Sequence, residues 1–154
     1  NLHASSGILF NHESERRGFE FVTRKISHAV ALIKLKKLKY LELGNLQAKR
    51  DWGYAPEYVE AMWLMLQQKE PDDYVVGTGE TKTIKYFVER AFGVLDLKYE
   101  KYLKINKKFF RPAEVELLIA DSSKIIKETG WKAKTKIDKL IEKMVINDLK
   151  LLNK

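Results

Sequence analysis

Two kinds of apolar spacing alternate along this chain of 154 residues. Short runs rich in β-branched and aromatic residues predict strands, and they lie at Ala4 to Phe10, Tyr40 to Leu43 and Tyr74 to Val76. Longer stretches, in which apolar residues recur with helical spacing, predict helices that face a core. Strands that alternate with amphipathic helices form sheets covered by helices. The expected fold class is therefore α/β.

Five amphipathic helices are expected beside these strands. The first spans Phe21 to about Lys37, and its lysine-rich end suits the negative pole of the helix dipole. The second begins at Pro56, because proline fits a first helical turn, and it runs to about Gln68. The spacing predicts that this second helix buries four apolar residues: Val59, Met62, Trp63 and Leu66.

The other three helices are expected in the second half of the chain. One follows a glycine-containing turn and carries apolar positions between Ile84 and Ala91. Another is capped by Asp121 and ends at Gly130, and the last begins near Ile137. Residues 93 to 110 alternate too loosely to distinguish a strand from an extended loop.

The composition excludes several classes of protein. No run of about 18 apolar residues is present, so no membrane span is expected, and the first residues do not read as a signal peptide. The chain has no Cys, which excludes disulfides and a thiol nucleophile and fits a reducing, cytoplasmic compartment. The three His residues lack the spacing of paired ligands, so no metal site is expected. The length is sufficient for a single compact unit.

The formal net charge of +8 allows three interpretations: a nucleic-acid surface, a site for an acidic small ligand, or solvated faces. Basic residues cluster at residues 34–39, 98–111 and 132–136. Because most of them are Lys and lie on different expected elements, solvated faces are favoured. Nucleic acid remains the minority alternative, and it predicts an affinity that falls strongly with salt.

The densest group of polar side chains begins where the first expected strand ends. From Gly7 to Gly18, an apolar run gives way to an amide, an imidazole, two carboxylates and two guanidiniums. Open α/β sheets bind their ligands at the carboxyl ends of the strands. We therefore expect this segment to line a ligand site.

Three further segments, 22–25, 49–53 and 110–115, place an Arg close to apolar or aromatic residues. The planar fork of Arg binds phosphate through two parallel hydrogen bonds, so these segments would suit a diphosphate if they converged. The alternative for each Arg alone is a structural ion pair. Examples are Arg50 with Asp51 and Arg111 with Glu114.

Two local patterns suggest chemistry less strongly. The turn Gly77-Thr78-Gly79 could cradle a phosphate, but it lacks the third glycine of a dinucleotide fingerprint and the Gly-Lys-Ser/Thr of a P-loop. A plain turn is favoured. The run His12-Glu13-Ser14 contains the groups of a hydrolase, yet neighbours in sequence seldom form a triad, and no Gly-x-Ser-x-Gly elbow is present. Catalytic hydrolysis is disfavoured.

Taken in order, these segments resemble the C-terminal part of the GDP-mannose 4,6-dehydratase family of extended short-chain dehydrogenases/reductases. The resemblance runs from about Gly7 to Leu149, with Glu15, Tyr54 and Ala133 as mild departures. Its most specific pieces are Gly7 to Arg17, Phe21 to Ile26, Gly44 to Leu46, Ala48 to Gly53, Tyr58 to Gln67, Pro71 to Glu80, Phe110 to Leu118 and Gly130 to Lys132. It implies the terminal strands and helix of a Rossmann-like sheet, joined to a small α/β substrate-binding domain. The N-terminal Rossmann half is expected to lie outside residues 1–154.

The resemblance also implies binding roles. His12 and Arg17 match positions that contact NADP. Six residues match positions that hold GDP-mannose: Asn11, Val22, Lys25, Arg50, Arg111 and Glu114. Among these, the two arginines are suited to the pyrophosphate and the glutamate to the guanine or ribose.

The resemblance implies an NADP-dependent lyase, which needs a Gly-rich turn to bind the cofactor and a Tyr-x-x-x-Lys pair for catalysis. This chain contains no such Gly-rich turn, and none of its Tyr residues is followed by Lys four residues later. No catalytic residue is therefore assigned, and the chain alone is not expected to turn over substrate. An exposed sheet edge would pair with a second copy or with a separate N-terminal half. A binding or oligomerisation module without catalysis is the alternative function.

Overall fold

The structure is a computed structural model that describes residues 2–110 and 115–153. No helix in these two ranges is long and apolar enough to cross a membrane. The elements in chain order are β1 (Gly7–Leu9), β2 (Asn11–Glu13), α1 (Val22–Lys34), β3 (Leu41–Leu43), β4 (Lys49–Tyr54), α2 (Ala55–Met65), β5 (Tyr74–Val76), β6 (Thr81–Thr83), α3 (Ile84–Val94), β7 (Leu103–Ile105), α4 (Ser123–Thr129) and α5 (Ile137–Leu152), with 3-10 turns at Tyr99–Lys101 and Lys107–Phe109.

The strands form three small sheets. β1 pairs in parallel with β5, and β3 pairs in parallel with β7. In the third sheet β4 is central, because it pairs in parallel with β2 and antiparallel with β6. The extended segment 116–118 runs beside the start of β4, where the Lys49 amide donates to the Glu116 carbonyl at 2.7 Å. β4 therefore connects segments that are far apart in the sequence.

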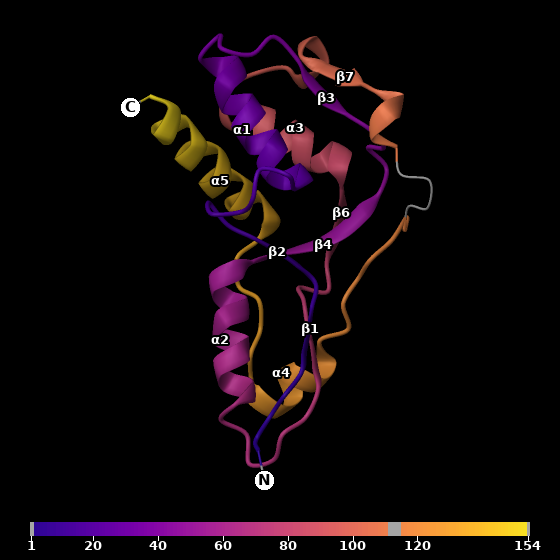
Figure 1. The fold of residues 1–154 in the computed structure, drawn as a ribbon, viewed down its shortest axis with the longest axis vertical. Coiled ribbons are helices and arrows are strands. Elements are labelled where there is room, and N and C mark those ends of the chain that lie inside the picture. Colours follow the sequence, from indigo (N-terminus) through magenta and orange to yellow (C-terminus); the bar gives the residue numbers. More distant parts are fainter. Residues whose placement is uncertain (1, 111–114, 154) are drawn as a thin grey trace.

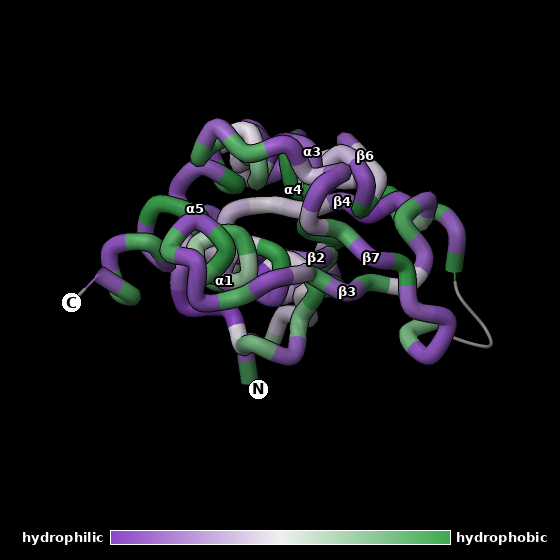
Figure 2. The backbone as a smooth tube through the Cα atoms, turned by 90° about the horizontal axis from the view of Figure 1, so that it is seen from above, coloured by the Kyte–Doolittle hydropathy of each residue, from purple (hydrophilic) through white to green (hydrophobic). Residues whose placement is uncertain are grey.

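Helices lie on two sides of the sheet that contains β4 (Figure 1), and the buried apolar residues form two clusters. In that view α1, α3 and α5 lie above the sheet, and α2 and α4 lie below it, together with β1. Figure 2, from above, shows α1 and α5 next to each other. The upper cluster includes Ile26, Val30, Leu41, Trp52, Phe87, Phe92, Leu140, Ile141 and Met144. The lower one consists of Tyr58, Ala61, Met65, Tyr74, Val76, Ile125 and Trp131.

The α/β fold class is confirmed, and most of the expected elements are present. All five predicted helices occur, four of them predicted from helical spacing or Pro56 and α4 from its capping residues, and the strands near Tyr40 and Tyr74 are β3 and β5. Gly130 ends α4 with φ 73°, the left-handed conformation that glycine favours. Asp121 lies one residue before the Ser122 cap, and its carboxylate accepts from the Ser123 amide at 3.0 Å.

Three short strands were not predicted as such. β2 begins immediately after β1, so the polar segment that begins at Asn11 is itself a strand rather than a loop. β6 and β7 have the sequences TKT and LKI, which carry little apolar pattern of their own. Their pairing with β4 and β3 makes them strands, and that pairing is a tertiary feature.

The predicted buried stripe of α2 is wrong. The helix packs against β2, β4, β5 and α4, and its buried residues are Tyr58, Ala61 and Met65. The four residues predicted to be buried are exposed instead, with Val59 and Trp63 each 61% accessible. Because α2 is apolar around most of its circumference, spacing alone could not decide which stripe faces this core.

Candidate functional site

A cavity of about 260 Å³ lies between the start of α1, the end of β3 and the start of β4. Three of the residues assigned to the nucleotide sugar line it: Val22, Lys25 and Arg50. The rest of its wall is formed by Glu20, Leu43, Gly44, Asn45, Ile84 and Phe109. The structure therefore brings together assigned residues that lie up to 28 positions apart in the sequence, Val22 and Arg50.

Lys25 and Phe109 give this cavity an aromatic and cationic wall. The Lys25 Nζ lies 4.0 Å from the centre of the Phe109 ring. Burial lowers the pKa of Lys25, and the nearby carboxylate of Glu42 partly opposes that shift. Gly44 makes room for this arrangement, because a Cβ there would overlap the backbone carbonyl of Phe109. A flat, polar or anionic ligand would suit such a wall.

Arg50 points its guanidinium along the edge of β4. Its Nη1 donates to the carbonyls of Lys49 at 2.8 Å and Val115 at 2.6 Å. Arg50 also borders a second, smaller hollow of about 100 Å³, whose cationic residues are Lys82, Lys132 and Lys136. The residues that line this hollow carry a net positive charge, because Arg50 and three lysines outnumber the single carboxylate of Glu80, which pairs with Lys136 at 2.5 Å.

Arg111 and Glu114 lie outside the described residues. The flanking segments reach the same region, because Phe109 lines the 260 Å³ cavity and Val115 accepts from Arg50. The roles expected for Arg111 and Glu114, including the alternative of a mutual ion pair, remain predictions.

Asn11 and His12 lie on β2, opposite Trp52 and Gly53 of β4. Neither lines the 260 Å³ cavity, so the structure does not place Asn11 with Val22, Lys25 and Arg50. The His12 Nδ1 is 2.8 Å from the carbonyl of Phe10, which can only accept, so Nδ1 is the donor in this contact. With Nδ1 engaged in this way, His12 is not oriented by a carboxylate as a hydrolase base would be.

Glu13, the last residue of β2, forms a partly buried pair with Arg17 of the following loop. Glu13 is only 2% exposed and accepts from the Thr23 hydroxyl at 2.5 Å, while the Arg17 Nε lies 3.2 Å from the same carboxylate oxygen. Burial raises the pKa of Glu13, whereas Thr23 and Arg17 act in the opposite direction. The Arg17 guanidinium also lies 3.4 Å from the centre of the Phe21 ring. These contacts fix the direction of Arg17.

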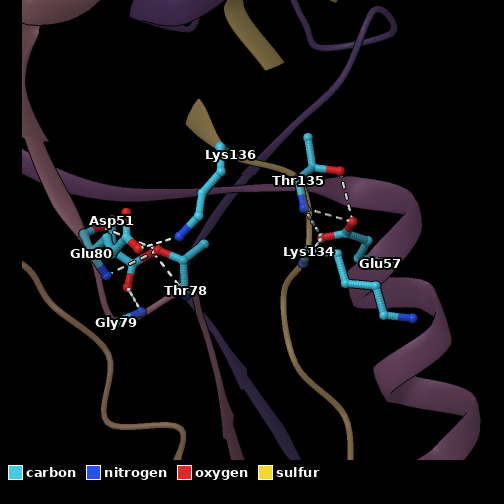
Figure 3. A network of polar contacts seen from close by, with 8 residues as sticks. All are labelled: Asp51, Glu57, Thr78, Gly79, Glu80, Lys134, Thr135 and Lys136. Carbon is cyan, nitrogen blue, oxygen red and sulfur yellow. Dashed lines mark hydrogen bonds and ion pairs between the residues drawn. The ribbon is translucent and has the colours of Figure 1, made fainter. Parts of the chain in front are cut away.

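The glycine turn after β5 binds a carboxylate of the protein itself, that of Asp51 (Figure 3). Asp51 is fully buried, and its Oδ1 accepts from the Thr78 amide at 3.0 Å and the Thr78 hydroxyl at 2.6 Å. Its Oδ2 accepts from the amides of Gly79 at 2.9 Å and Ala120 at 3.2 Å. The phosphate-cradle alternative is therefore wrong, and the plain turn is confirmed. Asp51 faces these donors, so the suggested pair with Arg50 is not its main interaction.

A second carboxylate that sequence reasoning missed fixes the segment after α4. Figure 3 shows Glu57 beside Lys134 and Thr135, at the start of α2. The Glu57 carboxylate accepts from the Lys134 amide at 3.1 Å and from the Thr135 amide and hydroxyl at 3.0 and 2.7 Å. This ties the residues that border the smaller hollow to α2. The only sequence signal was a Glu in a first helical turn, which also has the simpler explanation of the helix dipole.

A metal centre finds no support in the described parts of the chain. Within residues 2–110 and 115–153, no three side chains of His, Asp or Glu are grouped so that they could hold an ion.

Tyr58→Phe is expected to leave the free energy of unfolding unchanged or to raise it by up to about 1 kcal/mol. The Tyr58 ring is fully buried, and its hydroxyl has no hydrogen-bond partner among the described residues, so its removal relieves a desolvated group. Burial also raises the pKa of Tyr58, as expected for such a site. Urea denaturation would measure the change.

Tyr74→Phe is the matched control for this prediction. Tyr74 is equally buried, but its hydroxyl donates to Glu128 at 2.9 Å. That variant is expected to lose about 1 kcal/mol of stability. Equal losses in both variants would contradict the interpretation of Tyr58.

The chain is similar to known proteins in family, in sequence and in fold. A family model described as GDP-mannose 4,6 dehydratase matches residues 1–144. GDP-mannose 4,6 dehydratase 1 of Arabidopsis thaliana is 53% identical over 150 residues, which cover 97% of this chain and 42% of that protein. The human GDP-mannose 4,6 dehydratase is 46% identical over 169 aligned residues, with 99% and 45% covered. The chain thus spans less than half the length of these relatives.

Solved structures share the fold at lower sequence identity. RMD from Pseudomonas aeruginosa, complexed with NADPH, matches with a TM-score of 0.86 and 19% identity over 94% of this chain and 48% of that one. The dTDP-glucose 4,6-dehydratase of Bacillus anthracis, in complex with NAD, matches with a TM-score of 0.78 and 17% identity over 94% and 44%. At such identities the likeness establishes the fold alone, and the chain again corresponds to about half of each structure.

Proposed function

Because this chain belongs to the GDP-mannose 4,6-dehydratase family, we propose that it is the part of such an enzyme that binds GDP-mannose. The membership confirms the resemblance inferred from the motifs, and the fold is that of a segment of an extended short-chain dehydrogenase/reductase. One observation carries the proposal: Val22, Lys25 and Arg50 converge on one cavity of about 260 Å³. Residues 1–154 would act as a single unit in the cytoplasm.

The chemistry of the cavity suits a nucleoside diphosphate. The Phe109 ring and the Lys25 cation offer a face for a purine base, and the Arg50 guanidinium adds positive charge for the diphosphate. Arg111 would add a second guanidinium, Glu114 would accept from the guanine or ribose, and Asn11 would contact the ligand beyond the cavity.

NADP is the cofactor proposed for the complete enzyme. His12 and Arg17 fit its cofactor side, since both are partly buried polar groups, in β2 and in the loop that follows it, and Arg17 is fixed by Glu13 and Phe21. When bound, the cofactor would accept a hydride from the sugar and later return it, with loss of water between. The residues of this chain would hold and orient the ligands. The chain contains no Tyr-x-x-x-Lys pair, so the proton transfers would belong to the rest of the enzyme.

A complementary half of the fold is the proposed partner. Within the described residues β1 pairs along one edge only, with Ile8 exposed, and the outer stripe of α2 is uncovered. Relatives are more than twice as long as this chain, so a segment of theirs would supply a strand for β1 and cover for α2. Gel filtration with a separately produced N-terminal half of a relative should give coelution, which Trp63→Glu should weaken. Self-association instead would favour a homo-oligomer.

Thermal unfolding with GDP-mannose, GDP, NADP and duplex DNA in turn tests the proposal. Ligands that bind the folded state raise its unfolding temperature. We expect GDP-mannose and GDP to stabilise the chain. Stabilisation by DNA alone would contradict the proposal and support the nucleic-acid alternative.

Arg50→Ala is expected to weaken GDP-mannose binding by more than about 1 kcal/mol, the scale for loss of a charge-assisted hydrogen bond. Titration calorimetry would measure the affinity. The matched control is Arg90→Ala, because Arg90 pairs with Asp138 on the surface and does not line the 260 Å³ cavity. Unchanged affinity in Arg50→Ala, or an equal loss in both variants, would reject the role of Arg50.

A further inference from the structure

The first turn of α1 holds the loop that carries Arg17. Arg24 is only 5% exposed, and its Nη1 donates to the backbone carbonyls of Glu15 and Arg17, the latter at 3.1 Å. Thr23, the preceding residue, holds the Glu13 carboxylate that faces Arg17. Two consecutive buried residues of one helix therefore fix both the backbone of the loop and the partner of its cation.

Arg24 is itself held by the last helix. Its Nη2 lies 2.7 Å from the Asp148 Oδ1 of α5, and Asp148 is only 1% exposed. The Ser27 hydroxyl donates to the other Asp148 oxygen at 2.6 Å. A lone buried guanidinium would be very costly, so this carboxylate allows Arg24 to stay in the interior.

The arrangement does more than neutralise a charge. A stability role would be met by the Arg24–Asp148 pair alone, yet Arg24 also donates to two carbonyls of the loop. The planar fork of Arg can serve a carboxylate and carbonyls at once, which the single ammonium of Lys does with poorer geometry. The loop keeps few other internal bonds: the Arg17 amide donates to the Ser14 carbonyl at 3.1 Å and the Arg16 amide to the Ser14 hydroxyl at 3.1 Å.

We propose that Arg24, held by Asp148, is a positioning residue that sets the 14–18 loop and thereby the direction of Arg17. The C-terminal helix α5 is then coupled through one guanidinium to a loop near the start of the chain. That the loop faces NADP rests on the proposed function. The positioning itself rests on the contacts of Arg24 and Asp148.

Arg24→Lys separates positioning from charge, because it keeps a cation beside Asp148 and shortens its reach to the carbonyls. Hydrogen exchange resolved by residue is expected to show the Arg16 and Arg17 amides exchanging at least about tenfold faster. The amides of α5 should exchange as in the parent chain. Arg90→Lys is the matched control, since it alters an exposed Arg paired with Asp138, and it should leave the loop unchanged.

Asp148→Asn is the second variant. It removes the charge that holds Arg24 and is expected to accelerate exchange both in the loop and in α5. If the loop amides exchange at the parent rate in Arg24→Lys and Asp148→Asn, the positioning role is overturned. Loosening of α5 with an unchanged loop would likewise overturn it, because that result reports a purely structural pair.

NADP affinity of the parent chain and of Arg24→Lys distinguishes this inference from the proposed function. The variant is expected to bind NADP roughly tenfold more weakly, which is the usual effect of losing a residue that positions a ligand-binding side chain. A parent chain without affinity for NADP would count against the proposed cofactor role. The exchange result would still decide the positioning role, because it requires no ligand.

Discussion

Asp51→Ala is expected to lower the free energy of unfolding by about 3–5 kcal/mol, because four donors would lose one buried acceptor. These donors are the Thr78 amide and hydroxyl and the amides of Gly79 and Ala120. Asp51 is fully buried, so water does not readily replace the carboxylate. The substitution would release the turn after β5 and the segment before α4 from β4. Urea denaturation followed by circular dichroism would measure the loss.

Two further variants sharpen this prediction. Asp51→Asn keeps the shape but replaces one acceptor oxygen by a donor, so an intermediate loss of about 2–3 kcal/mol is expected. Asp121→Asn alters an exposed carboxylate that accepts from the Ser123 amide, and its transition should stay close to that of the parent chain. If Asp51→Ala unfolded at the same urea concentration as Asp121→Asn, the network around Asp51 would not be the main tie between these segments.

Helical spacing predicted the fold well wherever one side of a helix is apolar. In α1 and α5 the apolar residues form a single stripe, and the structure buries that stripe in the upper cluster. Helical spacing predicted the wrong buried stripe for α2, because apolar residues occur on both sides of this helix. Tyr58, Ala61 and Met65 are spaced as regularly as the residues of the exposed stripe. Which side is covered depends on β2, β4, β5 and α4, and these neighbours are not visible in the helix's own sequence.

The candidate site was predictable to the extent that its residues lie in specific motifs. The resemblance identified Val22, Lys25 and Arg50, and the fold gathers them in one cavity. In the same segments, the sequence did not reveal which residues stabilise the fold around the site. Asp51, next to Arg50, looked like an ion-pair partner, but β4 turns alternate side chains to opposite faces. Only the tertiary structure shows that Asp51 binds a turn 27 residues away.

The glycines of that turn correctly indicated a backbone that binds an anion, but the anion is a carboxylate and not a phosphate. Gly79 has φ 73°, a left-handed conformation that suits glycine, and its amide binds Asp51. A turn of amides around an anion is what the sequence suggested, but a carboxylate of the same chain supplies the anion. Sequence patterns of this kind predict the geometry of a backbone more safely than the identity of what it binds.

Gly77→Ala is expected to cost about 2–3 kcal/mol through overpacking. A Cβ at Gly77 would overlap the methyl group of Ala120 and lie 3.1 Å from the Asp51 Oδ2. The backbone cannot easily move away, because the Ser122 hydroxyl binds both the amide and the carbonyl of Gly77 at 3.0 Å. Gly93→Ala is the matched control: nothing lies within 4 Å of a Cβ there, so the helical α3 should gain up to about 1 kcal/mol.

The contact between Gly77 and Ala120 can be tested by compensation. Ala120→Gly removes the methyl group that a Cβ at residue 77 would meet, and alone it should cost no more than about 1 kcal/mol through backbone entropy. In the Gly77→Ala/Ala120→Gly double variant, most of the loss from Gly77→Ala should be recovered. Urea denaturation of the four proteins gives the coupling energy, expected to be at least about 1 kcal/mol in favour of the double variant. Strictly additive losses would show that the strain lies elsewhere, because only a direct steric contact makes the second substitution compensate for the first.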